Sequence, residues 1–226
     1  MFPLKADLPT RSVSFMTMAL ILVNVGVYLF HLSLGPGAFR IFFSYGAIPH
    51  QMIHEFGPNG LPLPVVKSIF TSMFIHGGFF HLAGNILYLW IFGNNVEDEL
   101  GHFRFIFFYL LCGAIAAYSH AIIEPASKVP MVGASGAVSG VLGAYFLLFP
   151  RAKILTLVPI GFFITTVRIP ALVVLGFWVI GQLMYALTSV QGQGGVAWFA
   201  HIGGFIAGMI LLRYFRSPRP RWRRHF

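Results

Sequence analysis

The chain has 226 residues, of which 57% are hydrophobic and only 9% charged, and its mean hydropathy is +0.79. Soluble domains carry roughly 25% charged residues, so this composition cannot cover a water-facing surface, and we expect lipid to surround most of the chain. The net charge of +9 could indicate nucleic-acid binding, but six of the fifteen Lys and Arg lie between Arg213 and Arg224, directly after an apolar run. A basic tail beside a membrane helix is typical of a lipid-headgroup anchor, so we expect membrane lipids, and no nucleic acid, as partners.

Six apolar runs reach or approach the roughly 20 residues that a spanning helix needs. The runs cover about residues 13–34, 79–96, 103–123, 132–149, 170–190 and 196–215. A seventh stretch, 154–167, is shorter and contains Pro159 and Gly161, which suits a hairpin at the membrane interface better than a span. The sequence therefore predicts an all-α membrane protein with a six-transmembrane-helix bundle at 13–215, an N-terminal segment at 1–12 and a basic tail at 216–226.

The distribution of positive charge tests this topology. With six spans, twelve Lys and Arg fall on the side of the two termini, and three fall on the other side, namely Arg40, Lys67 and Lys128. If 154–167 crossed the membrane, the basic tail would move to the side opposite the basic N-terminus. Cytoplasmic loops carry the excess of Lys and Arg, so we expect six spans with both termini cytoplasmic.

The loop between the first two spans, residues 35–75, is long and holds five prolines together with apolar patches. Such a loop is poorly suited to be a solvated linker, and we expect it to be partly buried in the outer leaflet. The first apolar run has no small-residue cleavage site after it, so we do not expect a cleavable signal peptide.

Polar residues inside spans are costly and are candidates for function. His81 and Asn85 open the second span at a spacing of i, i+4, which puts both on one helical face. Ser135 opens the fourth span within Gly-Ala-Ser-Gly, and His201 opens the sixth. These three spans all run from outside to inside, so the four residues share one depth in the outer leaflet and can converge.

Each of these features also has a simpler structural interpretation. Gly136-xxx-Gly140 and Gly204-xxx-Gly208 are patterns that let helices approach closely. His81 with Asn85 could be an interhelical hydrogen-bonding pair, and His201 could lie at the headgroup level. Taken alone, packing is the better interpretation of the glycine-rich motif around the serine, and we assign Gly204-xxx-Gly208 to packing. The repetition of polar clusters at one depth in three spans nevertheless favours a functional site.

The residue types fit nucleophilic catalysis. A serine hydroxyl attacks only when a base takes its proton, and neutral histidine can do so. The outer halves of these spans contain no Asp or Glu, so Ser135 and His201 would form a dyad. Asn85, His81 and the Ser135 backbone N–H could stabilise an oxyanion, and glycines such as Gly133 would let a substrate backbone approach.

These motifs together resemble the rhomboid family of intramembrane serine proteases. The matching features are Gly-Ala-Ser-Gly at 133–136, His81-xxx-Asn85 preceded by His76, Ala-His-xx-Gly at 200–204, and the acidic end of the second span. The resemblance implies Ser135 as nucleophile, His201 as general base, and His81, Asn85 and the Ser135 backbone as oxyanion donors. It further implies cleavage of single-pass or polytopic transmembrane proteins near helix-destabilising residues, without a metal or cofactor.

Two positions depart from the family pattern. Many members carry a tyrosine one turn after the nucleophile that stacks on the catalytic histidine, and here that position is Ser139. Many also carry a Trp-Arg pair in the first loop, which residues 35–75 lack. Neither change removes a reacting group, but Ser139 leaves the support of the His201 ring to another side chain.

Two other functions remain as alternatives. A catalytically inactive relative that escorts membrane proteins usually lacks the serine or the histidine, and both are present. A metal transporter or metalloprotease could use His76, His81 and His201, but the sequence has no His-Glu-x-x-His motif and no carboxylate at that depth. The absence of a transit peptide and of an extra span favours a bacterial plasma membrane, with the active site towards the outer side.

Overall fold

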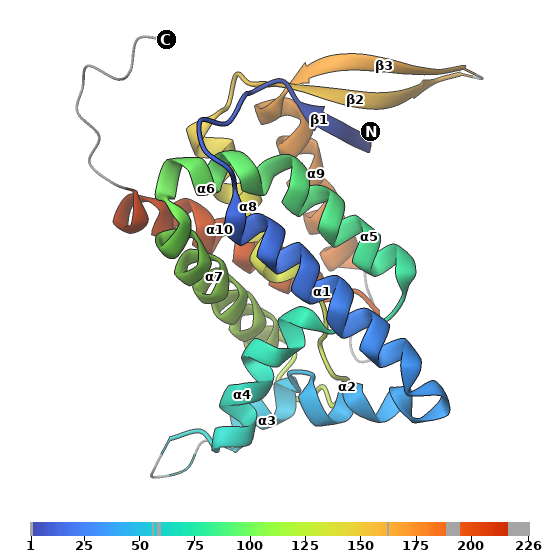
Figure 1. Cartoon of the computed structure of the whole chain (residues 1–226). Helices are drawn as coiled ribbons and strands as arrows, with labels where there is room; N and C mark the ends of the chain where they lie inside the picture. The colour runs from blue at the N-terminus through green and yellow to red at the C-terminus, as the bar shows by residue number, and fades with distance from the viewer. Residues whose placement is uncertain (1, 56, 58–59, 162, 189–194, 217–226) are drawn as a thin grey trace.

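The computed structural model describes residues 2–55, 57, 60–161, 163–188 and 195–216. It shows a bundle of helices with a small β-sheet at one end and short helices at the other (Figure 1). The helical elements are α1 (Phe15–Ser33), η1 (Gly35–Ala38), α2 (Phe39–Tyr45), α3 (Pro49–His54), α4 (Leu63–Thr71), η2 (Ser72–Phe74), α5 (Phe79–Tyr88), η3 (Leu89–Gly93), α6 (Asn94–Leu100), α7 (His102–Ile123), α8 (Ser135–Leu148), α9 (Ala171–Thr188) and α10 (Trp198–Phe215). The strands are β1 (Phe2–Ala6), β2 (Lys153–Ile160) and β3 (Phe163–Pro170).

Four of the described helices, α1, α7, α9 and α10, are long and apolar enough to cross a membrane. They coincide with the first, third, fifth and sixth predicted runs, and their ends differ from the predicted ones by at most two residues. The fourth predicted run forms α8, which has 14 residues and is shorter than an ordinary span. A helical membrane bundle is therefore confirmed, whereas six spans and the cytoplasmic side of both termini stay predictions.

The second predicted run forms a continuous helical stretch from α5 through η3 to α6. The middle element, η3, is a π-helical turn at Leu89–Gly93, so the stretch is not a uniform α-helix. Together with α4 and η2 the stretch can be counted as a fifth span, which is bent by 82° at the break between Phe74 and Phe79. This break holds His76, Gly77 and Gly78, directly before the helix that carries His81 and Asn85.

The core of the bundle is α8. Every residue from Ala137 to Tyr145 is buried, as expected for a helix that is apolar on all sides. Its glycines permit close contacts with both neighbouring helices. A Cβ on Gly143 would overlap the carbonyl of Phe205 in α10, and a Cβ on Gly140 would overlap the side chain of Cys112 in α7. The Gly204-xxx-Gly208 interpretation is confirmed, since a Cβ on either glycine would overlap a carbonyl oxygen of α8.

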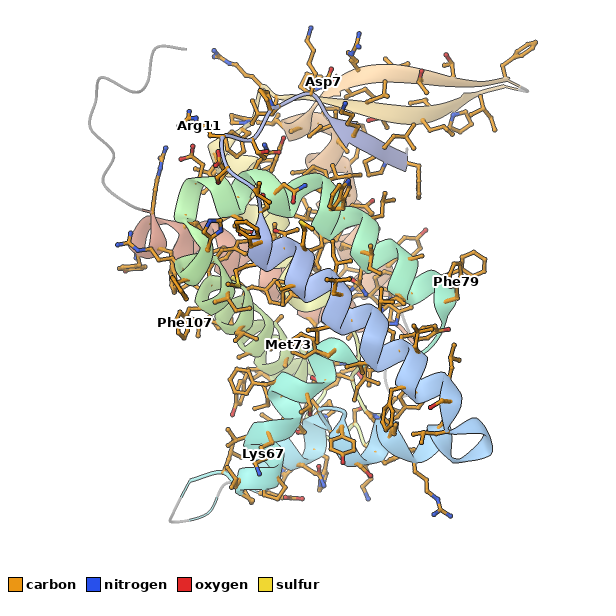
Figure 2. All side chains as sticks on the ribbon, in the orientation of Figure 1. Asp7, Arg11, Lys67, Met73, Phe79 and Phe107 are labelled. Atoms are coloured by element: carbon orange, nitrogen blue, oxygen red, sulfur yellow. The ribbon has the colours of Figure 1, made fainter. Side chains whose placement is uncertain are left out.

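The outer surface of the bundle is apolar. Figure 2 shows Phe79 and Phe107 pointing away from the helices, and the side chain of each is 64% exposed. Lys67 lies at the end with the short helices, whereas Asp7 and Arg11 lie at the end with the sheet (Figure 2). Large apolar side chains around the middle and charged groups at the ends are the arrangement that a bilayer requires.

The loop between the first two spans is largely helical. It contains η1, α2, α3, α4 and η2, with Met52, Val65 and Ile69 in the hydrophobic core. A solvated linker is therefore excluded, as the sequence predicted. Burial of this segment in the outer leaflet stays a prediction.

The prediction of an all-α fold is wrong at one end of the molecule. Strands β2 and β3 form an antiparallel hairpin that covers the expected stretch 154–167 and extends beyond it at both ends, and β1 pairs with β2 in the order β1-β2-β3. Val, Ile and Thr are frequent in 153–170 and favour extended backbone, and Gly161 at the turn has a φ of 59°. The N-terminal segment 1–12, for which no strand was predicted, contributes β1. Residues 217–226 of the predicted tail lie outside the described residues.

The acidic residues after η3 hold the start of α1. Glu97 is fully buried, and its carboxylate accepts hydrogen bonds from the backbone N–H groups of Met16 and Thr17 at 2.9 and 2.7 Å. His102 contacts the same carboxylate. The first N–H groups of a helix lack partners inside the helix, so Glu97 satisfies those of α1.

Candidate active site

The structure brings Ser135 and His201 together. Ser135 is the first residue of α8, and His201 lies in the first turn of α10. The Oγ atom of Ser135 is 2.8 Å from Nε2 of His201, a hydrogen-bonding distance. The glycine contacts between α8 and α10 bring these two helix starts close enough for this pair to form.

The second ring nitrogen of His201 also has a partner. Its Nδ1 lies 2.6 Å from Oε1 of Gln182, and both side chains are buried. Gln182 lies on α9 and was missed by the sequence analysis. The available signal was a lone amide within an otherwise apolar span, but the sequence alone does not say which face of that span meets His201.

Aromatic side chains from α9 and α10 surround the His201 ring. The Trp178 ring lies 6.2 Å from it, centroid to centroid, at an angle of 34°, and Trp198 lies 6.0 Å away with nearly perpendicular planes. Ser139 does not support the ring, because its hydroxyl donates to the backbone oxygen of Ser135 at 2.6 Å. The support that the sequence left open at position 139 therefore comes from Trp178 on α9, with the edge of Trp198 on α10.

His81, Asn85 and Gly133 form a second cluster next to Ser135. Gly133 has a φ of 118°, and a Cβ there would lie 2.5 Å from Nε2 of His81 and 3.7 Å from Nδ2 of Asn85. The loop before α8 can therefore pass against these two side chains only with glycine at this position. The Asn85 amide donates to the His81 carbonyl at 3.1 Å, which fixes its place one turn along α5.

His76 supports the loop before α8 from behind the cluster. Its ring lies 5.2 Å from that of His81, edge to face, and its Nε2 is 3.5 Å from the backbone N of Ala134. His76 is fully buried. Within the described residues, no group of three His, Cys, Asp or Glu side chains is arranged to hold a metal ion, so a site built on the three histidines gains no support.

All these residues except His76 and Gly133 line one cavity of about 1040 Å³. Its walls come from α5, the end of α7, α8, α9, α10 and the segments before α8 and α10. The polar groups next to the Ser–His pair are two amides and a second imidazole, contributed by Gln182, Asn85 and His81. His120, Glu124, Ser127, Ser139 and Tyr88 also line the cavity. A cavity with a few convergent polar groups in apolar surroundings is the usual form of a binding or active site.

A helical membrane bundle with a hydrogen-bonded Ser–His pair at the starts of two buried helices defines the class of protein. Residues 65–218 match the Rhomboid domain family model, which is more than half of the chain. The chain belongs to the rhomboid family, and family membership together with the apolar helices makes it an integral membrane protein.

Three relatives illustrate the family. Rhomboid-like protein 11, chloroplastic, of Arabidopsis thaliana is 29% identical over 206 residues, covering 85% of this chain and 62% of the relative. Rhomboid protease GluP of Bacillus subtilis (strain 168) is 32% identical over 151 residues, covering 67% and 26%. Rhomboid protein 1, mitochondrial, of Saccharomyces cerevisiae is 33% identical over 150 residues, covering 63% and 40%.

The chain spans less than two thirds of the length of each of these relatives. Their names point to chloroplasts and mitochondria, and one relative is bacterial, so the bacterial plasma membrane stays a prediction for this chain.

Proposed function

We propose that this protein is an intramembrane serine endopeptidase that cleaves transmembrane segments of other membrane proteins. The observation that carries the proposal is the 2.8 Å contact between Ser135 Oγ and His201 Nε2 at the wall of a cavity. Membership of a family that includes a relative named as a protease adds support. An inactive relative that only binds its clients would not need a hydroxyl paired with an imidazole.

In the proposed reaction, Ser135 Oγ attacks the carbonyl carbon of the scissile peptide bond while its proton passes to Nε2 of His201. The tetrahedral intermediate collapses when the C–N bond breaks, and Nε2 returns the proton to the leaving amine. A water molecule then attacks the acyl ester, again with Nε2 as base, and releases the second product and free Ser135. Every proton transfer in this scheme uses one nitrogen of one residue.

The negative charge on the tetrahedral oxygen needs donors aimed at it. The Ser135 N–H is at the start of α8, where N–H groups lack helical partners and the helix dipole favours an anion. The side chains of His81 and Asn85 lie next to Gly133, two residues before this N–H, and both line the same cavity as Ser135. We assign these three donors to the oxyanion hole, with Gly133 keeping the approach to them open.

The substrate class follows from the surroundings of the cavity. An apolar bundle admits a peptide that is itself stable in lipid, and such a peptide must be unwound locally before its carbonyl can reach Ser135. Substrates with helix-destabilising residues near the cleaved bond meet this requirement. The excess of positive charge at the termini favours a site that opens towards the outer side of the membrane.

The test is labelling and cleavage by the full chain in proteoliposomes. We expect a fluorophosphonate probe to label the protein, and a model transmembrane substrate to be cut, in the presence of a chelator. Ser135→Ala and His201→Ala should abolish both signals. Ser68→Ala is the control, because Ser68 is a buried serine on α4 whose hydroxyl donates to the Val65 carbonyl of its own helix.

Cleavage by Ser135→Ala at the rate of the unmodified chain would overturn the proposal. Client binding without labelling or cleavage by the unmodified chain would support the inactive-relative alternative instead.

A further inference from the structure

Both ring nitrogens of His201 have partners, and the two partners come from different helices. Nε2 faces the hydroxyl of Ser135 on α8, and Nδ1 faces the amide of Gln182 on α9 at 2.6 Å. The amide–imidazole contact is buried, with each of the two residues 9% exposed. A buried polar contact of this length is a hydrogen bond that the low dielectric of the protein interior strengthens.

The direction of this bond decides whether His201 can act as a base. When the amide oxygen of Gln182 faces Nδ1, that nitrogen carries the hydrogen and Nε2 has a free lone pair for the serine proton. If Nε2 of a neutral ring carried the hydrogen instead, it would donate to Ser135 and could not take its proton. A partner that accepts from Nδ1 therefore selects the reactive tautomer.

The position of Gln182 on α9 gives that helix a defined part in the site. Trp178 lies one turn before Gln182 on the same face, and its ring lies beside that of His201. Ser139 on α8 cannot stack on the ring. Orientation of the ring in its plane and cover over its face both come from α9.

We propose that Gln182 is the positioning residue of His201, so that the site is a chain of three side chains, Ser135–His201–Gln182. This inference rests on the proposed function. Gln182 touches no reacting atom; its amide oxygen accepts the Nδ1 hydrogen, holds the ring in plane and keeps Nε2 available to Ser135. The sequence predicted a dyad because the outer halves of the three spans contain no Asp or Glu. A neutral amide oxygen can accept the Nδ1 hydrogen of histidine in place of a carboxylate.

The first test is the kinetics of three variants on a transmembrane substrate. Gln182→Met keeps the size of the side chain but removes the acceptor, and we expect kcat to fall roughly 10- to 100-fold while KM stays within about twofold. Gln182→Glu keeps an acceptor for the Nδ1 hydrogen, so its kcat should be well above that of Gln182→Met. Ile180→Met is the matched control, because it puts methionine on the exposed side of the same helix.

The pH profile adds a readout that a structural role would not move. The titratable groups that act on His201 are His81 on α5 and His120 on α7. Glu124 at the end of α7 and Tyr88 on α5 line the same cavity, and both are present in every variant compared. A carboxylate at position 182 favours the protonated imidazolium, which cannot act as base. The acidic limb of the kcat profile of Gln182→Glu should therefore shift to higher pH.

The second test reads the tautomer without catalysis. In ¹⁵N-histidine NMR of the Ser135→Ala chain, the His201 signals should show a protonated Nδ1 and a bare Nε2. Adding Gln182→Met should produce a mixture of both tautomers. This measurement shows whether Gln182 sets the tautomer of His201 even if Ser135 proves not to be the nucleophile. Failure of the proposed function and failure of this inference can therefore be told apart.

Either of two results would overturn the inference. One is an unchanged kcat in a folded Gln182→Met chain whose His201 keeps a protonated Nδ1. The other is a folded Gln182→Glu chain that loses as much kcat as Gln182→Met. If Gln182→Met does not fold, the Glu variant and the NMR of the Ser135→Ala chain still decide the question.

Discussion

His201 is held from two sides that are built in different ways. On one side, Gly204 and Gly208 of α10 bring the backbone so close to α8 that a Cβ on either glycine would overlap a carbonyl oxygen. On the other side, Gly176 and Gly181 of α9 have no neighbouring atom within 4 Å of a Cβ. α9 therefore reaches the site through side chains, whereas α10 reaches it through its backbone.

The difference separates two properties of the site. The distance between Ser135 and His201 is set by helices whose backbones touch, and such contacts permit little adjustment. The orientation of the His201 ring is set by Gln182 and Trp178, which extend from a helix with a largely exposed surface. A change in the first region should damage folding and activity together, whereas a change in the second can alter activity alone.

The largest effect is expected from Gly208→Ala. The new Cβ would overlap the carbonyl oxygen of Gly140, so α10 must move away from α8. Overpacking of this kind costs about 1–3 kcal/mol, and a misplacement of about 1 Å at a catalytic pair can cost roughly 100-fold in rate. We expect a lower Tm in detergent and a loss of most cleavage activity, measured on the same preparation. An unchanged Tm with full activity would show that the α8–α10 contact is not rigid.

A smaller overall effect, on catalysis but not on helix packing, is expected from Asn85→Ala on α5. Loss of one oxyanion donor lowers kcat by roughly 10- to 1,000-fold without removing the nucleophile or base. The matched control is Asn94→Ala, because the Asn94 amide donates to the carbonyl of Trp90 at 2.9 Å in the same i, i−4 pattern, but away from the cavity. Turnover equal to that of the unmodified chain would remove Asn85 from the oxyanion hole.

The smallest effect is expected from Gly176→Ala on α9. Nothing lies within 4 Å of the added Cβ, and alanine favours helix over glycine by about 1 kcal/mol. We expect an equal or slightly higher Tm and cleavage within about twofold of the unmodified chain. A strong loss of activity would show that α9 packs as tightly as α10 during the reaction. The claim that α9 reaches the site only through its side chains would then be wrong.

The sequence predicted the parts of the fold that depend on local pattern. Apolar runs of spanning length located α1, α7, α9 and α10, because a bilayer imposes a minimum length on each span. The topology also predicted that Ser135 and His201 would converge, and the structure brings them within hydrogen-bonding distance. Their catalytic roles, and those of His81, Asn85 and Gly133, stay predictions.

Other features depended on contacts that are distant in the sequence. β1 pairs with a strand about 150 residues later, and neither segment signals this pairing by itself. Gln182 was not recognised because its role depends on which face of α9 meets α10. The helices of residues 35–75 were not recognised because prolines and short apolar patches hide their periodicity, although proline is well suited to the first turn of α3 and α4.

The buried carboxylate of Glu97 also bears on how the chain assembles. It binds the first backbone N–H groups of α1, which are about 80 residues earlier, and it contacts His102 at the start of α7. Asp98 next to it accepts hydrogen bonds from the backbone N–H groups of Arg11 and Ser12. These contacts at the start of the first membrane helix use side chains that are synthesised about 80 residues later, so they can form only after α6 has been made.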